Sequence, residues 1–202
     1  MSKIKSVCVY CGSGPGTDPA YVEAAQEFGK DLAKNGVRLV YGGGMIGIMG
    51  AVATAVIENG GAVTGIIPEF LIAREHAQRN GQELIVTRDM HERKRNMFER
   101  ADAFVAMPGG IGTLEELVEQ ITWAQLGRHR KPILLANIKG FWDPLCALFE
   151  HMKALQFIRY GLDFELLQVD RAADILPRLE AAAAAVPEEA KRMQTAAQPE
   201  RL

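Results

Sequence analysis

Short apolar runs and longer amphipathic runs alternate along the whole chain, and glycine-rich turns separate many of them. Short apolar runs predict buried strands, whereas apolar positions three and four residues apart predict helices. The pattern predicts strands over residues 4–10, 37–41, 63–67, 83–86, 103–107, 133–136 and 166–169. It predicts helices over about 18–35, 45–59, 90–101, 114–126, 144–155 and 172–185. Residues 69–80 fit an irregular or short helical segment.

Regular alternation of strands and helices is typical of the α/β class, because strand–helix–strand units produce parallel sheets that helices cover. We therefore expect a single-domain, Rossmann-like parallel sheet with helices on both faces. No linker or repeat interrupts the pattern, so residues 1–187 are expected to form one domain, followed by a flexible tail at 188–202. Ligands of such sheets bind beyond the carboxyl ends of the strands.

Composition adds little to this fold but excludes several classes of function. The 202 residues are 48% hydrophobic, and 23 basic against 25 acidic residues leave a net charge of −2. This balance does not support binding to nucleic acid or to a membrane surface. No apolar run reaches membrane-spanning length and the N-terminus lacks a signal-peptide pattern, so a cytoplasmic location is expected.

The three cysteines are interpreted as small buried side chains. Cys8 and Cys11 form a C-x-x-C pair, but Cys8 lies inside an apolar run and no second pair is present. A zinc site needs further ligands, so no metal site is expected, and Cys146 falls in a helical pattern.

Glycine-rich segments around Gly12, Gly42 and Gly109 each follow a predicted strand, so all three fall at one edge of the sheet. Residues 42–47 match G-x-G-x-x-G, but they follow the second strand, and no acidic residue ends the next strand to bind a ribose. A mononucleotide site built from several glycine loops fits better than a full NAD site. Tight turns that need glycine would explain any one loop without a ligand.

Residues 107–116 are the most informative stretch, since a strand, a glycine turn and a helix start follow one another there. Free N–H groups at a helix start bind phosphate. Thr113 and Glu116 also match a capping box, with Thr113 as the N-cap, and this local pattern favours capping over catalysis. The buried stripe of the helix is predicted to contain Leu114, Leu117, Val118 and Ile121.

Residues 91–95 form the densest basic cluster, and a solvated helix face is its simplest interpretation. However, Arg93 lies one turn from both Met90 and Met97, so it flanks the buried stripe, where it could hold a phosphate or a ribose. The remaining histidines, His76, His129 and His151, have no convincing partners, so surface or core roles are expected.

Residues 108–116, PGGIGTLEE, resemble the P-G-G-x-G-T-x-x-E signature of the LONELY GUY proteins, and segments 9–13, 41–44, 47–50, 89–94 and 121–127 match as well. These proteins are cytokinin riboside 5′-monophosphate phosphoribohydrolases, often labelled lysine decarboxylases. The resemblance implies a Rossmann-like homodimer without a cofactor. It also implies hydrolysis of the N-glycosidic bond of N6-modified adenosine 5′-monophosphates, and often of AMP, to free base and ribose 5-phosphate.

By the same resemblance, Arg93 and Glu116 are the catalytic residues. The implied nucleotide-binding positions are Ser13, Gly43, Gly44, Glu75, Lys94, Gly109, Gly110, Ile111, Gly112, Thr113, Leu114, Glu115 and Thr122. Ile111 stands at the variable position of the signature, where plant members usually carry tyrosine, so contacts to the base or to a partner are expected to differ there.

Cleavage of an N-glycosidic bond develops positive charge at the sugar and negative charge on the leaving purine. We expect the glycine loops and Thr113 to hold the 5′-phosphate, Glu116 to serve the ribose and water, and Arg93 to neutralise developing charge. One alternative is a non-catalytic nucleotide or cofactor carrier, because related Rossmann-like proteins include molybdenum-cofactor carriers. Another is a pyridoxal-phosphate decarboxylase, for which Lys94 and Lys131 are the nearest lysines without a recognisable cofactor context.

Overall fold

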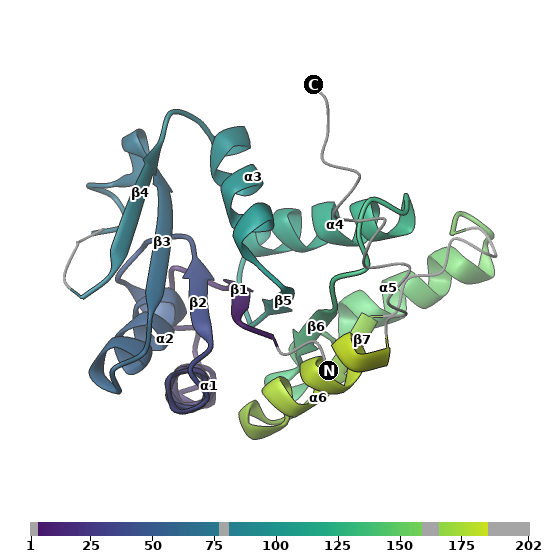
Figure 1. Ribbon diagram of the computed structural model, residues 1–202. Helices are drawn as coiled ribbons and strands as arrows, with labels where there is room; N and C mark the ends of the chain where they lie inside the picture. Colours follow the sequence, from purple (N-terminus) through teal and green to yellow (C-terminus); the bar gives the residue numbers. More distant parts are fainter. Residues whose placement is uncertain (1–3, 77–80, 159–165, 186–202) are drawn as a thin grey trace.

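The computed structural model describes residues 4–76, 81–158 and 166–185. Its strands form one parallel seven-stranded sheet in the order β4-β3-β2-β1-β5-β6-β7 (Figure 1). The strands are β1 (Ser6–Tyr10), β2 (Arg38–Tyr41), β3 (Val63–Pro68), β4 (Glu83–Thr87), β5 (Ala103–Ala106), β6 (Ile133–Ala136) and β7 (Leu166–Val169). Each predicted strand is present, with ends that differ by at most two residues.

Helices cover both faces of the sheet, which confirms the expected architecture. One face packs against α1 (Ala20–Lys34), α2 (Gly47–Glu58) and α6 (Ile175–Ala185). The other packs against α3 (Met90–Arg100), α4 (Ile111–Gln125) and α5 (Asp143–Ala154). Figure 1 shows α1 and α6 on the opposite side of the strands from α3 and α4. Side chains of β1 alternate between the two cores, as a pleated strand requires.

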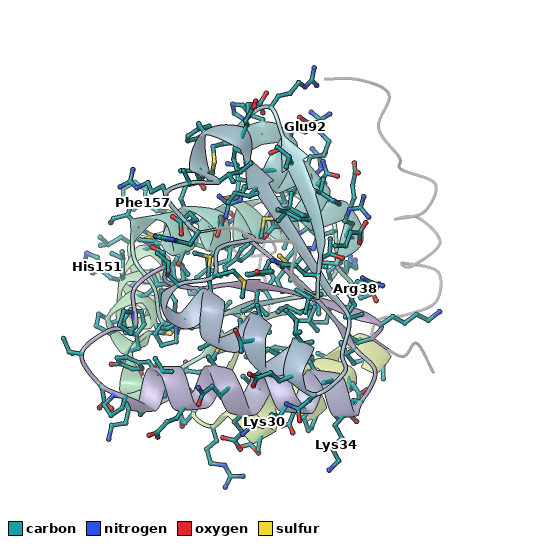
Figure 2. All side chains as sticks on the ribbon, turned by 90° about the vertical axis from the view of Figure 1, so that its left-hand side faces the viewer. Lys30, Lys34, Arg38, Glu92, His151 and Phe157 are labelled. Atoms are coloured by element: carbon teal, nitrogen blue, oxygen red, sulfur yellow. The ribbon has the colours of Figure 1, made fainter. Side chains whose placement is uncertain are left out.

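The first helix illustrates how the apolar pattern places an element. Phe28 and Leu32 of α1 are fully buried, whereas Lys30 and Lys34 point outward from the helix (Figure 2). Before its first turn, an Asp18 carboxylate oxygen accepts a hydrogen bond from the Ala20 N–H at 2.9 Å. This contact pairs one of the N–H groups that have no partner inside the helix.

The sheet reverses its direction of growth at β1, because β2 lies on one side of β1 and β5 on the other. Loops after β1 and β5 therefore border a topological switch point, the place where ligands bind in open α/β sheets. The two loops touch, since the Gly12 N–H donates to the Pro108 carbonyl at 3.0 Å. The start of α2 joins them through Met49, whose N–H donates to the Gly12 carbonyl at 3.2 Å. The three glycine loops thus form one contiguous edge.

The capping-box interpretation of Thr113 is wrong, because α4 begins at Ile111 rather than at residue 114. Gly110 is the N-cap, in an extended conformation, and no side chain caps this helix. Since β5 already ends at Ala106, the short turn that follows is enough to redirect the chain, and Thr113 falls inside the first helical turn.

Two other helix predictions also need correction. Val118 was expected in the buried stripe of α4, but it is 40% exposed, while Glu116 and Gln120 are buried. The last helix begins at Ile175 rather than at residue 172, because Ala172–Asp174 form a 3₁₀ turn.

Most other expectations agree with the structure as far as it describes them. Glu69–Leu71 form a 3₁₀ turn, and turns follow to residue 76, so this segment is irregular as predicted. All three cysteines are free. Cys8 and Cys11 are buried as predicted, and burial raises the pKa of both thiols, but the prediction is wrong for Cys146, which is only partly buried on α5. Residues 77–80 and the predicted tail at 188–202 lie outside the described residues.

No helix in the described part of the chain is long and apolar enough to cross a membrane. The cytoplasmic location and the domain boundary at residue 187 stay predictions.

Candidate active site

Two side chains form hydrogen bonds at the start of α3, the helix that carries Arg93. The Asp89 carboxylate accepts a hydrogen bond from the Glu92 N–H at 2.8 Å, and the Glu92 carboxylate accepts one from the Arg88 N–H at 2.9 Å. Asp89 is thus the N-cap, and the two bonds hold the first turn of α3, which carries Arg93. We missed this N-cap in the sequence, although Asp89 stands directly before the predicted start of the helix at residue 90.

Arg93 and Glu116 meet across the interface between α3 and α4. Arg93 Nη2 lies 3.7 Å from Glu116 Oε1, and both side chains are only 10% exposed. The guanidinium also lies where a Cβ on Gly42 would be, so only glycine leaves room for it at that position. The structure therefore brings together the two residues predicted to be catalytic, beside one of the glycine loops.

Burial raises the pKa of Glu116 to about 7, although the Arg93 guanidinium opposes this shift and the Glu115 carboxylate adds to it. A carboxyl group with such a pKa exists in both protonation states near neutral pH. It can therefore accept or donate a proton under the conditions in which most enzymes work.

Lys94 links the same two helices on their more exposed side. Its ammonium group lies 2.6 Å from a Glu115 oxygen and 3.0 Å from a Glu119 oxygen. The predicted contact between Lys94 and a nucleotide thus competes with two carboxylates of α4. We did not predict a role for Glu119, although its four-residue spacing from Glu115 places both on one helix face.

Several buried side-chain polar atoms have no hydrogen-bond partner within the described residues. They are Glu75 Oε2, Arg93 Nε, Glu119 Oε2 and both polar atoms of the Gln120 amide. The Glu75 oxygen borders the glycine loop after β2, because a Cβ on Gly44 would lie 3.0 Å from it, and the Arg93 guanidinium borders the same loop at Gly42. Since an unpaired buried polar group costs about 1–3 kcal/mol, a polar ligand at this loop that pairs with Glu75 Oε2 or Arg93 Nε would be favoured.

The start of α4 offers an anion-binding site next to this pair. A Cβ on Gly109 would lie 2.7 Å from Thr113 Cβ and 2.8 Å from the Gly12 nitrogen, so only glycine fits there. Gly110 and Gly112 face open space. The first amides of a helix have no acceptor inside it and carry partial positive charge. Those of α4 can therefore bind a phosphate.

Some predicted binding residues do not face the Arg93–Glu116 pair. The Thr122 hydroxyl donates to the Val118 carbonyl at 2.7 Å, on the exposed side of α4. Ser13 is exposed in the loop after β1, where its backbone packs against Gly47. Gly43 has φ +80° and packs against β3, so a tight turn explains this glycine. Leu114 is partly buried against the core.

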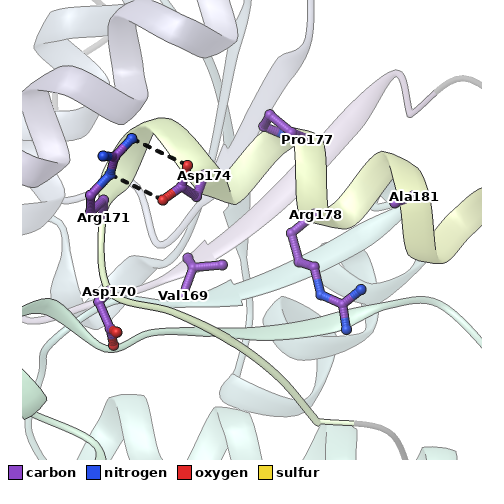
Figure 3. A pocket seen from close by; sticks show the side chains of 7 residues that line it. All are labelled: Val169, Asp170, Arg171, Asp174, Pro177, Arg178 and Ala181. Atoms are coloured by element: carbon purple, nitrogen blue, oxygen red, sulfur yellow. Dashed lines mark hydrogen bonds and ion pairs between the residues drawn. The ribbon is translucent and has the colours of Figure 1, made fainter.

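Elsewhere, a cavity of about 600 Å³ opens beside β7, the edge strand (Figure 3). Its lining residues are Val169, Asp170, Arg171, Asp174, Pro177, Arg178 and Ala181, and none of them belongs to α3 or α4. Arg171 Nε is paired with an Asp174 oxygen at 3.1 Å. Within the three described ranges, no cluster of His, Cys, Asp and Glu side chains could hold a metal ion.

Solved structures with the same fold include cofactor-binding proteins. The molybdenum cofactor binding protein from Rippkaea orientalis matches with a TM-score of 0.66 and 20% identity, over 90% of this chain and 98% of that one. A Moco carrier protein from Chlamydomonas reinhardtii matches with a TM-score of 0.66 and 21% identity, over 92% and 100% of the two chains. At this identity, the likeness shows the fold alone.

Sequence relatives are more similar. The chain is 45% identical over 179 residues to the cytokinin riboside 5′-monophosphate phosphoribohydrolase LOG of Oryza sativa subsp. japonica, covering 89% of this chain and 74% of that protein. It is 43% identical over 179 residues to the corresponding LOG7 enzyme of Arabidopsis thaliana, covering 89% and 82%. A family model described as "Possible lysine decarboxylase" matches residues 49–179. The chain therefore belongs to this family and groups with its LONELY GUY phosphoribohydrolases, as the signature at residues 108–116 predicts.

Proposed function

We propose that this chain hydrolyses the N-glycosidic bond of adenosine 5′-monophosphates, including N6-modified ones, and releases the free base and ribose 5-phosphate. The observation that carries the proposal is the buried pair of Arg93 and Glu116 beside the amide-rich start of α4. Relatives that are 41–50% identical over most of the chain are named as cytokinin riboside 5′-monophosphate phosphoribohydrolases, which supports the same activity here.

The arrangement suits a substrate that needs opposite charges a few ångströms apart. With the 5′-phosphate on the amides of α4 and beside Thr113, C1′ of the ribose comes near Glu116. A bond then forms between a water oxygen and C1′ as the C1′–N9 bond breaks. The Glu116 carboxylate accepts one proton of the water, and the purine leaves with the electron pair of the broken bond. The proton is then passed from Glu116 to the purine, directly or through solvent, which restores the carboxylate. Arg93 counters the negative charge that develops on the base.

Two lysines bear on the decarboxylase alternative. A pyridoxal-phosphate enzyme needs a lysine amine that can form a Schiff base. The ammonium of Lys94 is held between Glu115 and Glu119, and that of Lys131 lies 2.6 Å from the Phe98 carbonyl oxygen. Both amines are therefore engaged in contacts that hold helices, which favours the hydrolase.

Incubation with a panel of compounds tests the proposal, with free base detected by chromatography. We expect adenine from AMP and the modified base from isopentenyladenosine monophosphate. The matching nucleosides should react far more slowly, because they lack the phosphate that the α4 amides would hold. Tight nucleotide binding without release of base would instead identify a carrier. Carbon dioxide from lysine in the presence of pyridoxal phosphate would identify a decarboxylase.

We also propose that the chain forms a homodimer through the exposed face of α4. Ile111, Val118 and Leu126 are 83%, 40% and 73% exposed, which is unusual for large apolar side chains on one helix. The spacing of Ile111, Val118 and Thr122 places them on the same side of the helix. A second copy that covers this side would bring its own site near Thr122, the predicted binding residue that faces away from Glu116.

Val118→Glu is expected to convert the dimer into a monomer, because the introduced carboxylate would be buried without a partner. Sedimentation equilibrium measures the mass of the wild type and the variant. Val86→Glu is the matched control, since Val86 of β4 is 45% exposed and lies off this face. A wild type with the mass of a single chain, or a Val118→Glu variant that stays dimeric, would contradict the proposed interface.

A further inference from the structure

The segment of residues 128–131, which follows α4, contacts both helices of the candidate site. His129 is only 2% exposed, and its ring packs near Phe98 and Phe104. Its Nε2 lies 3.2 Å from the Gln120 carbonyl oxygen, and its Nδ1 lies 3.1 Å from the Lys131 backbone nitrogen. Since the Lys131 N–H must donate, Nδ1 is the acceptor and Nε2 carries the proton. The bond to Nδ1 therefore requires the neutral ring, and only that form makes both bonds at once.

Lys131 makes the second connection, to the end of α3. Its ammonium group lies 2.6 Å from the Phe98 carbonyl oxygen and 4.0 Å from the centre of the Phe98 ring. A cation is favourable at the carboxyl end of a helix, where carbonyl groups lack partners. A charge-assisted hydrogen bond and a cation–π contact thus hold the segment to α3, while His129 holds it to α4.

The contacts of His129 and Lys131 lie on the same two helices that carry Glu116 and Arg93. Gln120 lies one turn after Glu116 on α4, and Phe98 lies near the end of the helix that carries Arg93. Arg93 Nη2 and Glu116 Oε1 are 3.7 Å apart, too far for a hydrogen bond, so their own contact does not fix their separation. That separation depends on how α3 and α4 are held.

We propose that His129 and Lys131 are positioning residues, which clamp α3 to α4 and so set the distance between Arg93 and Glu116. This inference rests on the proposed function, in which that distance tunes the carboxyl group. Burial lowers the pKa of His129 to about 4, so the ring keeps its neutral form throughout the neutral pH range. The hydrogen bonds of His129 are therefore expected to persist over the whole pH range in which Glu116 titrates.

Lys131→Met tests the clamp, because methionine preserves much of the apolar stem and removes the cation. We expect kcat for AMP hydrolysis to fall about tenfold with KM within about twofold, since the catalytic pair loosens while the phosphate site is untouched. When the helices loosen, Glu116 loses both the nearby cation, which lowers its pKa, and part of its burial, which raises it, so the midpoint of the pH profile should move away from the wild-type value. Lys131→Arg should restore most of the activity, because a guanidinium can also donate to the Phe98 carbonyl. His129→Phe, which keeps an aromatic ring, should shift the profile in the same direction.

Two controls separate positioning from general stability. Lys153→Met removes an exposed lysine of α5 that pairs with Glu150, and it should change neither kcat nor the profile. Leu179→Ala removes a buried contact of α6, so it should lower Tm without moving the profile. A Lys131→Met variant with a lower Tm but wild-type kcat and pH profile would overturn the clamp as a positioning device.

Carbon-13 NMR of the Glu116 carboxyl measures the midpoint of its titration without substrate and without turnover. A midpoint in Lys131→Met that differs from the wild-type value supports the clamp, and an unchanged midpoint overturns it. An inactive wild type would refute the proposed function alone, since this comparison still decides the clamp.

Discussion

Glu116→Gln is expected to lower kcat for AMP hydrolysis by about 10³-fold, while the Kd for AMP changes only a few-fold. Glutamine has nearly the same size and can occupy the same buried place beside Arg93. It can neither accept a proton from water nor carry the negative charge that stabilises the sugar cation. Free base released at saturating AMP, measured by chromatography, gives kcat, and calorimetry gives Kd.

Glu99→Gln is the matched control, because Glu99 is an exposed residue near the end of α3. It should leave both kcat and Kd unchanged. Near-wild-type turnover by Glu116→Gln would show that Glu116 has only a structural role.

Glu116→Gln also tests the raised pKa of the Glu116 carboxyl, which is about 7 against an ordinary 4.5. The folded protein then binds more protons than the unfolded chain between these values. Wild-type stability should therefore fall by up to about 3 kcal/mol as pH rises through this window, and that of Glu116→Gln should not.

Glu116 illustrates what the sequence could predict and what it could not. The prediction that it is catalytic came from the resemblance of residues 108–116 to a known signature, whereas the local pattern alone favoured a helix cap. The spacing of Thr113 and Glu116 satisfies a capping box, but Gly110 ends the turn and α4 starts three residues earlier than predicted. In the structure Glu116 is buried beside Arg93 of α3, and this is a long-range contact that a local pattern does not contain.

The outer face of α4 was mispredicted for a related reason. Periodicity assigns apolar residues to the core, so Val118 was placed there and Gln120 was not. In the structure, Gln120 is fully buried and Val118 is 40% exposed. Binding sites and subunit interfaces break the apolar pattern in this way, because they bury polar groups and expose apolar ones. The strands and glycine loops were predicted well, since each depends on local sequence.

Arg93→Met is expected to lower kcat/KM for AMP by about 10²-fold, because the negative charge that develops on the leaving base loses its counterion. Methionine fills much of the same space beside Gly42 without a charge. The cation normally opposes the effect of burial on Glu116, so its removal should raise the pKa of that carboxyl above about 7. If the carboxylate is the active form, wild-type kcat/KM rises with pH to a plateau above the pKa of Glu116. The midpoint in Arg93→Met should then lie at higher pH.

Arg93→Lys separates the two contributions of this residue, since it keeps the positive charge but loses the planar fork that can hold two oxygen atoms. We expect its kcat/KM to lie between those of the wild type and Arg93→Met, with a midpoint close to the wild-type one. Profiles of kcat/KM against pH for the three proteins provide the comparison. A midpoint that stays in place in Arg93→Met, despite lower activity, would mean that Arg93 acts on the substrate alone. In that case the 3.7 Å approach to Glu116 would not tune the carboxyl, and burial together with the nearby Glu115 carboxylate would account for its shifted titration.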